Sequence, residues 1–193
     1  EIHCDQPGDV TELAGRLWRS RRPIAARWLD PGPLSPRGGH SVTWTGDEMI
    51  VWGGRSDENS SSTFDDGAAY DPATQTWRML PPTELASRHD HIAVWTGTEL
   101  LIVGGGDGTS GAAYDPANDS WRSLSAVPFA VNRNVGWTWS SGRLVVWHPR
   151  TDRVAAFDPE VNAWTNLSPT GLESAVGVLR SGQGSVVAVA AVE

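Results

Sequence analysis

Short strand-like segments follow one another along the chain from residue 36 onward. Residues 41–45 alternate polar and apolar side chains, which is typical of a strand with one buried face. Residues 49–52 form a continuous apolar run, as expected of a strand buried on both faces. Thr45-Gly46-Asp47, between the two segments, has the composition of a tight hairpin. No segment beyond residue 36 has helical periodicity, so the pattern predicts antiparallel strands.

This pattern is repeated at a nearly constant period. Tyr70 and Tyr114 are 44 residues apart, and Phe157 follows Tyr114 after 43 residues. Each aromatic residue is followed by Asp-Pro, a pair that suits the first two positions of a type I turn. Four residues separate each Asp-Pro pair from a Trp. These tryptophans are Trp77, Trp121 and Trp164. A period of this size with strand-like segments indicates propeller blades, each a small antiparallel sheet.

Four strands fit into each repeat. The first repeat predicts strand A near 40–45, strand B near 48–53, strand C near 67–71 and strand D near 75–79. Because one such sheet cannot cover both of its faces, neighbouring sheets must stack face to face.

The order of these motifs resembles the kelch repeat. His40 and His91 stand near the start of strand A, a Gly-Gly pair follows strand B, and Tyr-Asp-Pro precedes Trp at a fixed spacing. The resemblance covers residues 36–190, and the Trp-Thr-Gly-x-Glu phrase is similar to bacterial kelch proteins in particular. It implies an all-β fold, a β-propeller of four-stranded antiparallel kelch blades that form a partial or small ring.

The resemblance divides the chain as follows. We expect an N-terminal segment at 1–23, in which residues 9–18 could form a short helix with Asp9 or Thr11 as its cap. Propeller blades occupy 24–193. They are blade 1 (36–80), blade 2 (87–124), blade 3 (132–167) and a partial blade 4 (172–193), which strand 24–29 could complete.

Blades 3 and 4 depart from the repeat. Blade 3 has His148-Pro149 in place of the Gly-Gly pair and Val135 in place of the His, and its hairpin glycine, Gly142, comes one place later. Blade 4 shows two strands joined at Gly182, without an Asp-Pro turn or a Trp.

The number of blades leaves three alternatives, because kelch propellers usually have five to eight. The chain can be a fragment of a longer propeller, can need a second copy or another chain to complete the ring, or can close as a four-bladed ring. The chain does not begin with Met and it stops within an apolar run, so we expect that both ends are cut.

Composition limits the partners and the packing. With 23 acidic and 15 basic residues the formal net charge is −8, which disfavours nucleic acid and anionic membrane surfaces. The longest apolar run, at 185–192, is too short to cross a membrane. Eleven tryptophans carry most of the aromatic burial. Six of them are predicted to pack between blades: Trp44, Trp77, Trp95, Trp121, Trp139 and Trp164.

The candidate ligand-binding residues follow from the repeat geometry. Arginines precede successive A strands and could converge on a carboxylate, a phosphate or a sugar acid, or could instead bond loop carbonyls. Other candidates begin the longest loops, end B strands near the channel or start A strands. The full set is Arg37, His40, Arg55, Arg88, His91, Asp107, Arg133, Trp52 and Trp147.

No catalytic residue, metal site or cofactor is predicted. His89 and His91 could form a metal pair, but His91 matches the kelch His and His89 matches Gly38, so no ligand set is repeated. The run 104–108 is rich in Gly but does not open a helix, which disfavours a phosphate loop. A copper site like that of galactose oxidases is also disfavoured, since Cys4 is terminal.

These observations predict a non-catalytic binding or scaffold module that recognises a protein or glycan through its loop face. The alternative is a carbohydrate-active or sugar-acid-processing kelch enzyme domain, similar to sialic-acid mutarotases and incomplete in this chain. Its members would be Arg37, Arg88, His40 and His91. We expect no nucleic acid and no membrane insertion. The resemblance to exported bacterial proteins favours an extracytoplasmic location, although no signal peptide is visible.

Overall fold

The computed structural model describes residues 32–57, 62–132, 134–168, 175–180 and 186–190, and for the last two ranges only the backbone. The chain divides into two compact units, Glu1–Pro31 and Gly32–Glu193, and the first lies outside the described residues. The predicted helix at 9–18 and the predicted strand at 24–29 therefore lie outside the described residues. Arg133 lies outside them as well. Every regular element in the described part of the chain is a β-strand.

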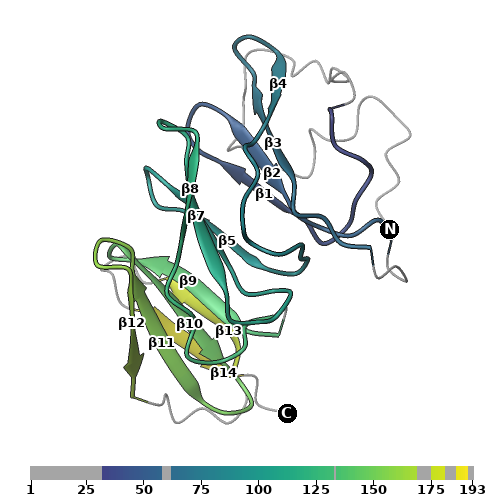
Figure 1. Ribbon diagram of the computed structural model, residues 1–193. Helices are drawn as coiled ribbons and strands as arrows, with labels where there is room; N and C mark the ends of the chain where they lie inside the picture. Colours follow the sequence, from purple (N-terminus) through teal and green to yellow (C-terminus); the bar gives the residue numbers. More distant parts are fainter. Residues whose placement is uncertain (1–31, 58–61, 133, 169–174, 181–185, 191–193) are drawn as a thin grey trace, which may run out of the picture. The chain divides into compact units, whose positions relative to one another are not determined.

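Three four-stranded antiparallel sheets form blades 1 to 3 (Figure 1). In each sheet the strands are ordered A, B, C and D, with strand A at one edge and strand D at the other, as the repeat predicts. Blade 1 consists of β1 (Ser41–Trp44), β2 (Met49–Trp52), β3 (Gly67–Asp71) and β4 (Thr76–Met79). Blade 2 consists of β5 (Ile92–Trp95), β6 (Leu100–Val103), β7 (Gly111–Asp115) and β8 (Ser120–Ser123). Blade 3 consists of β9 (Gly136–Ser140), β10 (Arg143–His148), β11 (Arg153–Asp158) and β12 (Ala163–Leu167).

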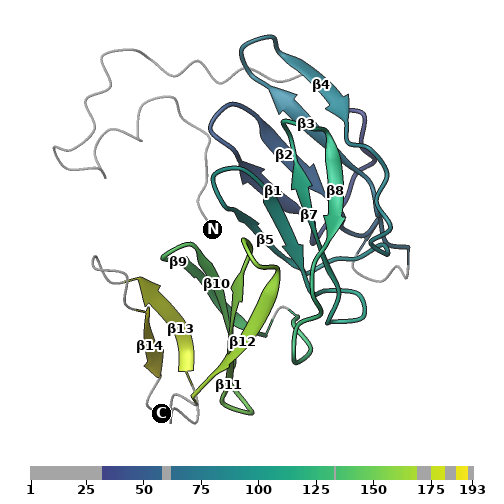
Figure 2. The same ribbon diagram turned by 60° about the vertical axis from the view of Figure 1, so that its left-hand side comes forward.

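A fourth, two-stranded sheet consists of β13 (Ala175–Arg180) and β14 (Val186–Ala190). The A strands lie next to one another: β1 contacts β5, and β9 contacts β13. Figure 2 shows β1 and β5 side by side. The predicted all-β architecture of kelch-type blades is confirmed.

The hydrophobic core lies between the blades. One buried cluster joins blades 1 and 2 and includes Ile50, Trp52 and Ile102; Trp95 and Trp121 pack against it. A second cluster joins blades 2 and 3, and Trp139 and Trp164 pack against that one. The predicted inter-blade packing is therefore confirmed for these four tryptophans. Burial of these side chains stabilises the stacking of the sheets, by ~25 cal/mol for each Å² of apolar surface removed from water.

The prediction for Trp44 is wrong, because its side chain is 54% exposed. In the β1–β2 register Trp44 pairs with Met49 and Val42 with Val51, whereas Ile50 and Trp52 belong to the core shared with blade 2. Because side chains alternate across a strand, Trp44 and Val42 lie on the opposite face of blade 1. The corresponding Trp95 is covered because blade 1 precedes it.

The Asp-Pro turns are bonded as the sequence predicts. The Oδ1 atoms of Asp71, Asp115 and Asp158 accept hydrogen bonds from the backbone N–H two residues on, at 2.7, 2.8 and 3.1 Å. The residue before each D strand has a left-handed backbone: Gln75 (φ 59°), Asp119 (φ 48°) and Asn162 (φ 51°). The four-residue connection between strands C and D, the same length in all three blades, explains the constant spacing between Asp-Pro and Trp.

Candidate loop-face site

The B–C connections make one face of the blades uneven. Blade 1 has a long loop between Trp52 and Gly67, blade 2 a shorter one between Val103 and Gly111, and blade 3 only a turn between His148 and Arg153. The segments that lead into β5 and β9 lie against these loops, since Gly54 N–H donates to the Arg88 carbonyl oxygen at 2.8 Å and Gly105 N–H to that of Val131 at 2.9 Å. We refer to this side of the blades as the loop face.

The Gly-Gly pair allows this close approach. A Cβ atom on Gly104 would lie 2.6 Å from Cβ of Val131 in the segment before blade 3, and one on Gly105 would lie 2.6 Å from the His89 carbonyl oxygen. Both glycines also have positive φ angles, of 72° and 66°. Only glycine fits both requirements without strain, so the pair positions the loop against the neighbouring segments.

Arg88 holds both ends of the B–C loop of blade 2. Its Nη1 donates to the carbonyl oxygens of Gly104 at 2.6 Å and Ser110 at 3.2 Å, so it joins the two ends of the loop. Its Nη2 donates to Ser110 Oγ at 2.8 Å, and its Nε donates to the Ala86 carbonyl oxygen at 2.9 Å. Burial lowers the pKa of Arg88, and the charge of Asp107 partly offsets that effect.

Arg37 has the same role in blade 1. Its Nη1 donates to the Gly53 carbonyl oxygen at 3.1 Å and to Asp66 Oδ1 at 2.7 Å, again joining the two ends of the loop. The guanidinium also lies over the Phe64 ring, 4.2 Å from its centroid. Both arginines therefore make the loop-carbonyl contacts that the sequence offered as one of two alternatives.

No such arginine brace is found among the described residues of blade 3. Counting back from Trp95 and Trp139 at matching positions, Asn132 stands where blade 2 has Arg88, and Arg133 stands one place later. With only a turn between β10 and β11, blade 3 has no long loop to hold. Arg133 therefore does not align with Arg37 and Arg88, although the sequence pattern grouped the three arginines.

A hollow of about 580 Å³ opens between the loops of blades 1 and 2 and the segments before β5 and β9. We call it the inner hollow. Its lining combines charged and amide side chains from three blades, including Arg55, His89, Asp90, Asp107 and Asn134, and Arg88 borders it while only 1% exposed. It is within the size range of small-ligand sites.

Two carboxylates in the inner hollow are held in fixed positions. Asp107 Oδ1 accepts hydrogen bonds from Thr109 N–H, Ser110 N–H and Ser110 Oγ at 2.9, 2.9 and 3.0 Å. These bonds lower the pKa of Asp107, with the Ser110 backbone N–H contributing most. Asp90 has a left-handed backbone, donates its N–H to the Gly39 carbonyl oxygen at 3.0 Å and lies 3.0 Å from His89 Nδ1 through Oδ2.

The histidine of the repeat lies below this surface. His91 Nε2 is 2.9 Å from Ser41 Oγ, and its ring meets that of Trp52 edge-on at 5.2 Å between centroids. Burial, with the nearby Arg88 charge, lowers the pKa of His91 to about 4. A neutral His91 therefore links strand β5 to strand β1, while His40, its counterpart in blade 1, is exposed.

Of the nine predicted site residues, the structure brings Arg55, Arg88 and Asp107 together at the inner hollow. Trp52 and Trp147, which end B strands, are 1% and 4% exposed and lie within the blades. Arg37, His40 and His91 do not line this hollow. Asp90 and Asn134 were not among the predicted site residues. Their position just before an A strand, like that of the arginines, was the available signal.

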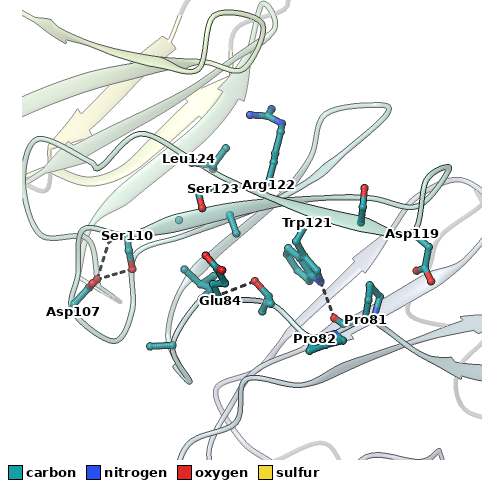
Figure 3. Close-up of a pocket in the computed structure, with 16 residues that line it drawn as sticks. Pro81, Pro82, Glu84, Asp107, Ser110, Asp119, Trp121, Arg122, Ser123 and Leu124 are labelled. Carbon is teal, nitrogen blue, oxygen red and sulfur yellow. Dashed lines mark hydrogen bonds between the residues drawn. The ribbon is translucent and has the colours of Figure 1, made fainter.

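An outer hollow of about 720 Å³ lies between β8 and the segment 81–86 (Figure 3). Pro81, Pro82 and Trp121 provide apolar surface, and the Trp121 indole N–H donates to the Pro81 carbonyl oxygen at 3.0 Å. Glu84 and Asp107 also line it. Neither Glu84 nor this hollow was predicted from the sequence, since both depend on how the segment 81–86 packs against β8.

Within the described ranges, no three His, Cys, Asp or Glu side chains are grouped as a metal site would require. The same part of the chain contains no helix long and apolar enough to span a membrane.

Comparison with known proteins agrees with this architecture. Residues 36–84 match the family model described as Kelch motif. The chain is similar to a solved structure titled "Structure of YjhT", with a TM-score of 0.58 and 17% identity, over 74% of this chain and 55% of that one. This chain thus spans about half the length of that structure, and likeness at this identity shows the fold alone. No curated protein matches the chain.

The sheets, their stacking and these similarities define a set of β-propeller blades. The chain contains a kelch motif, which the family model matches in blade 1. Such a fold fits a binding or scaffold module, because it presents loops from several blades on one rigid face.

Proposed function

We propose that this chain is a non-catalytic binding module that recognises a protein or glycan through its loop face, with the inner hollow as the point of contact. The observation that carries the proposal is the convergence of polar side chains from three blades on one hollow, over loops that Arg37 and Arg88 tie down at both ends. Rigid support of this kind reduces the conformational entropy lost on binding.

The placement of the arginines favours this function over the sugar-acid enzyme. An anion site formed by Arg37 and Arg88 would need guanidinium N–H groups that face the ligand. Instead, Arg88 makes four hydrogen bonds to its own surroundings, and Arg37 is paired with Asp66. His91, another of the four residues proposed for that enzyme site, is buried and bonded to Ser41.

A blocking variant tests the proposal. Asn134→Trp fills the inner hollow from an exposed position outside the strands, and Ala73→Trp places the same side chain on an Asp-Pro turn as the matched control. Binding would be measured by calorimetry against three probes: a neutral oligosaccharide, an acidic peptide and a basic peptide. We expect at least one probe to bind, and Asn134→Trp to weaken that binding about tenfold or more, equivalent to ~1.4 kcal/mol.

The proposal would be contradicted if none of the three probes binds. It would also be contradicted if the bound probe is unaffected by Asn134→Trp or equally affected by Ala73→Trp.

A further inference from the structure

The inner and outer hollows adjoin. Asp107 lines both, and of two consecutive residues Ala86 lines the outer hollow and Ser87 the inner one. Together they form a groove that leads from β8, past Asp107, to the segment before β5. Figure 3 shows the outer part of this groove, with Asp107 and Ser110 at one end and Trp121, Pro81 and Asp119 at the other.

Carboxylate side chains line the groove along its length. Glu84 lines the outer hollow on an exposed segment, Asp107 lies where the hollows meet, and Asp90 lines the inner hollow. The hydrogen bonds to Asp107 Oδ1 hold that group ionised, and Oδ2 accepts none from the described residues. Carboxylates at intervals along a groove are suited to cationic groups.

The cations beside the groove are already engaged. Arg88 is buried and its N–H groups point to loop carbonyls. Arg122 makes a two-point contact with Glu99, at 2.7 Å from Nε and 2.6 Å from Nη2. Arg55 also has interactions of its own. Four carboxylates (Glu84, Asp90, Asp107 and Asp119) and three arginines line the two hollows, so acidic groups outnumber the arginines, in keeping with the formal net charge of −8 for the chain.

The groove also has an apolar part, which distinguishes it from a simple site for a small cation. Pro81, Pro82 and Trp121 line the outer hollow beside Glu84. A ligand that places cationic groups against the carboxylates and apolar groups against these rings matches the whole length of the groove. An extended peptide with alternating basic and apolar side chains has this arrangement, because successive side chains point to opposite sides.

We propose that the groove binds an extended, basic segment of a partner protein, with Arg or Lys side chains paired to Glu84, Asp107 and Asp90. This inference rests on the proposed function, since it names the partner class of the same loop face. Electrostatic complementarity of this kind sets specificity and raises the association rate.

The test uses the full chain and a synthetic peptide of about nine residues, which is roughly 30 Å long when extended. Its Arg residues alternate with Leu and Ser, and Glu replaces Arg in the control peptide. Asp90→Asn and Asp107→Asn are combined in one variant. Asn keeps the Oδ1 acceptor for the Ser110 and Thr109 N–H groups and tolerates the left-handed backbone of residue 90. The matched control combines Asp71→Asn and Asp115→Asn, which changes the net charge equally at the Asp-Pro turns.

We expect the basic peptide to bind the wild-type chain, and the Asp90/Asp107 variant to bind it about tenfold or more weakly, with the turn variant within about twofold of wild type. Raising NaCl from about 0.05 to 0.3 M should weaken binding to the wild type more than binding to the Asp90/Asp107 variant.

Three results would overturn the inference: tighter binding of the acidic peptide, equal losses in the two variants, or equal affinity for spermidine and for the peptide. A fourth result would overturn this inference but leave the proposed function intact. In that result a neutral oligosaccharide binds the wild-type chain and binds Asn134→Trp more weakly, while the basic peptide does not bind.

Discussion

Arg88 donates a 2.6 Å hydrogen bond to the Gly104 carbonyl oxygen, and Arg37 makes the corresponding bond to Gly53 at 3.1 Å. In both blades the arginine lies before strand A and its partner lies at the start of the B–C loop. The same side chains also reach the residue that precedes the C strand, Ser110 or Asp66. One side chain thus fixes both ends of a loop, and this relation supports several predictions.

Replacement of Arg88 by Lys should destabilise the chain although the charge is kept. A single ammonium cannot satisfy the carbonyl oxygens of Ala86, Gly104 and Ser110 together, so buried acceptors lose their partners. We expect a loss of about 2–3 kcal/mol in the free energy of unfolding, measured by urea denaturation. Arg150→Lys, at an exposed turn, serves as the control, and a loss as large as that of Arg88→Lys would contradict the bracing role.

Addition of one methyl group at Gly104 should have a similar effect. Gly104→Ala forces an alanine into a left-handed backbone and places Cβ 2.6 Å from Val131. We expect a destabilisation of about 2–4 kcal/mol, the sum of backbone strain and overpacking. The same substitution at Gly38, where a Cβ meets nothing within 4 Å, should change the unfolding midpoint little. Equal midpoint shifts in the two variants would refute the packing account of the Gly-Gly pair.

Tyr114→Phe should weaken the connection between blades 1 and 2. Arg78 Nη1 of blade 1 donates to Tyr114 Oη at 2.8 Å, and that hydroxyl donates to Asp119 Oδ1 at 2.6 Å. Burial raises the pKa of Tyr114 to about 12, so the phenol stays neutral and keeps its proton for Asp119.

We expect Tyr114→Phe to cost about 1 kcal/mol, with a comparable coupling energy to Arg78→Ala in a double-mutant cycle. Phe157 holds the same position in blade 3, where Arg122 bonds to the Pro159 carbonyl oxygen at 3.4 Å instead. Additive effects of the two substitutions would show that the hydroxyl does not couple the blades.

Stability should fall as the pH falls from about 6.5 to about 4, in part because of His91. Its folded-state pKa is about 4, below the ordinary histidine value of 6.5, so the unfolded chain binds more protons in this window and protonation favours unfolding. The full effect is at most about 3 kcal/mol and is complete below pH 4. His91→Gln, which can keep a hydrogen bond to Ser41, should flatten this part of the curve. An unchanged difference between pH 6.5 and pH 4 in the variant would rule out the His91 contribution.

The strands could be predicted from the sequence because local signals determine them. The predicted B strand at 48–53 is β2 at Met49–Trp52, and the Asp-Pro turns form through bonds within a few residues. The exposure of Trp44 could not be predicted this way. Trp44 and Trp95 stand in the same place in the repeat, and only the presence of a preceding blade decides which of them is covered.

The candidate site was less predictable for a similar reason. The position of Arg88 before strand A was visible in the sequence, but the direction of its guanidinium depends on carbonyl groups that approach from a separate loop. Asp90 and Glu84 belong to no sequence motif. They line the same hollows as Asp107 only because the segment before β5 packs against blade 2. The binding roles of the predicted residues stay predictions.

The two-ended anchoring of the blade 2 loop has a practical consequence. Arg88 contacts Gly104 and Ser110, and apart from Asp107 the hydrogen bonds at the loop ends involve backbone atoms and these end residues. Within the loop, Gly108 is buried and exchanges backbone hydrogen bonds with Gly105 and Val131, so an insertion belongs at the exposed residues Gly106 and Asp107, before it. Loop closure becomes only slowly more costly with length. A foreign peptide could be grafted at this point as an epitope or affinity tag, displayed on a scaffold that already holds both of its ends in register.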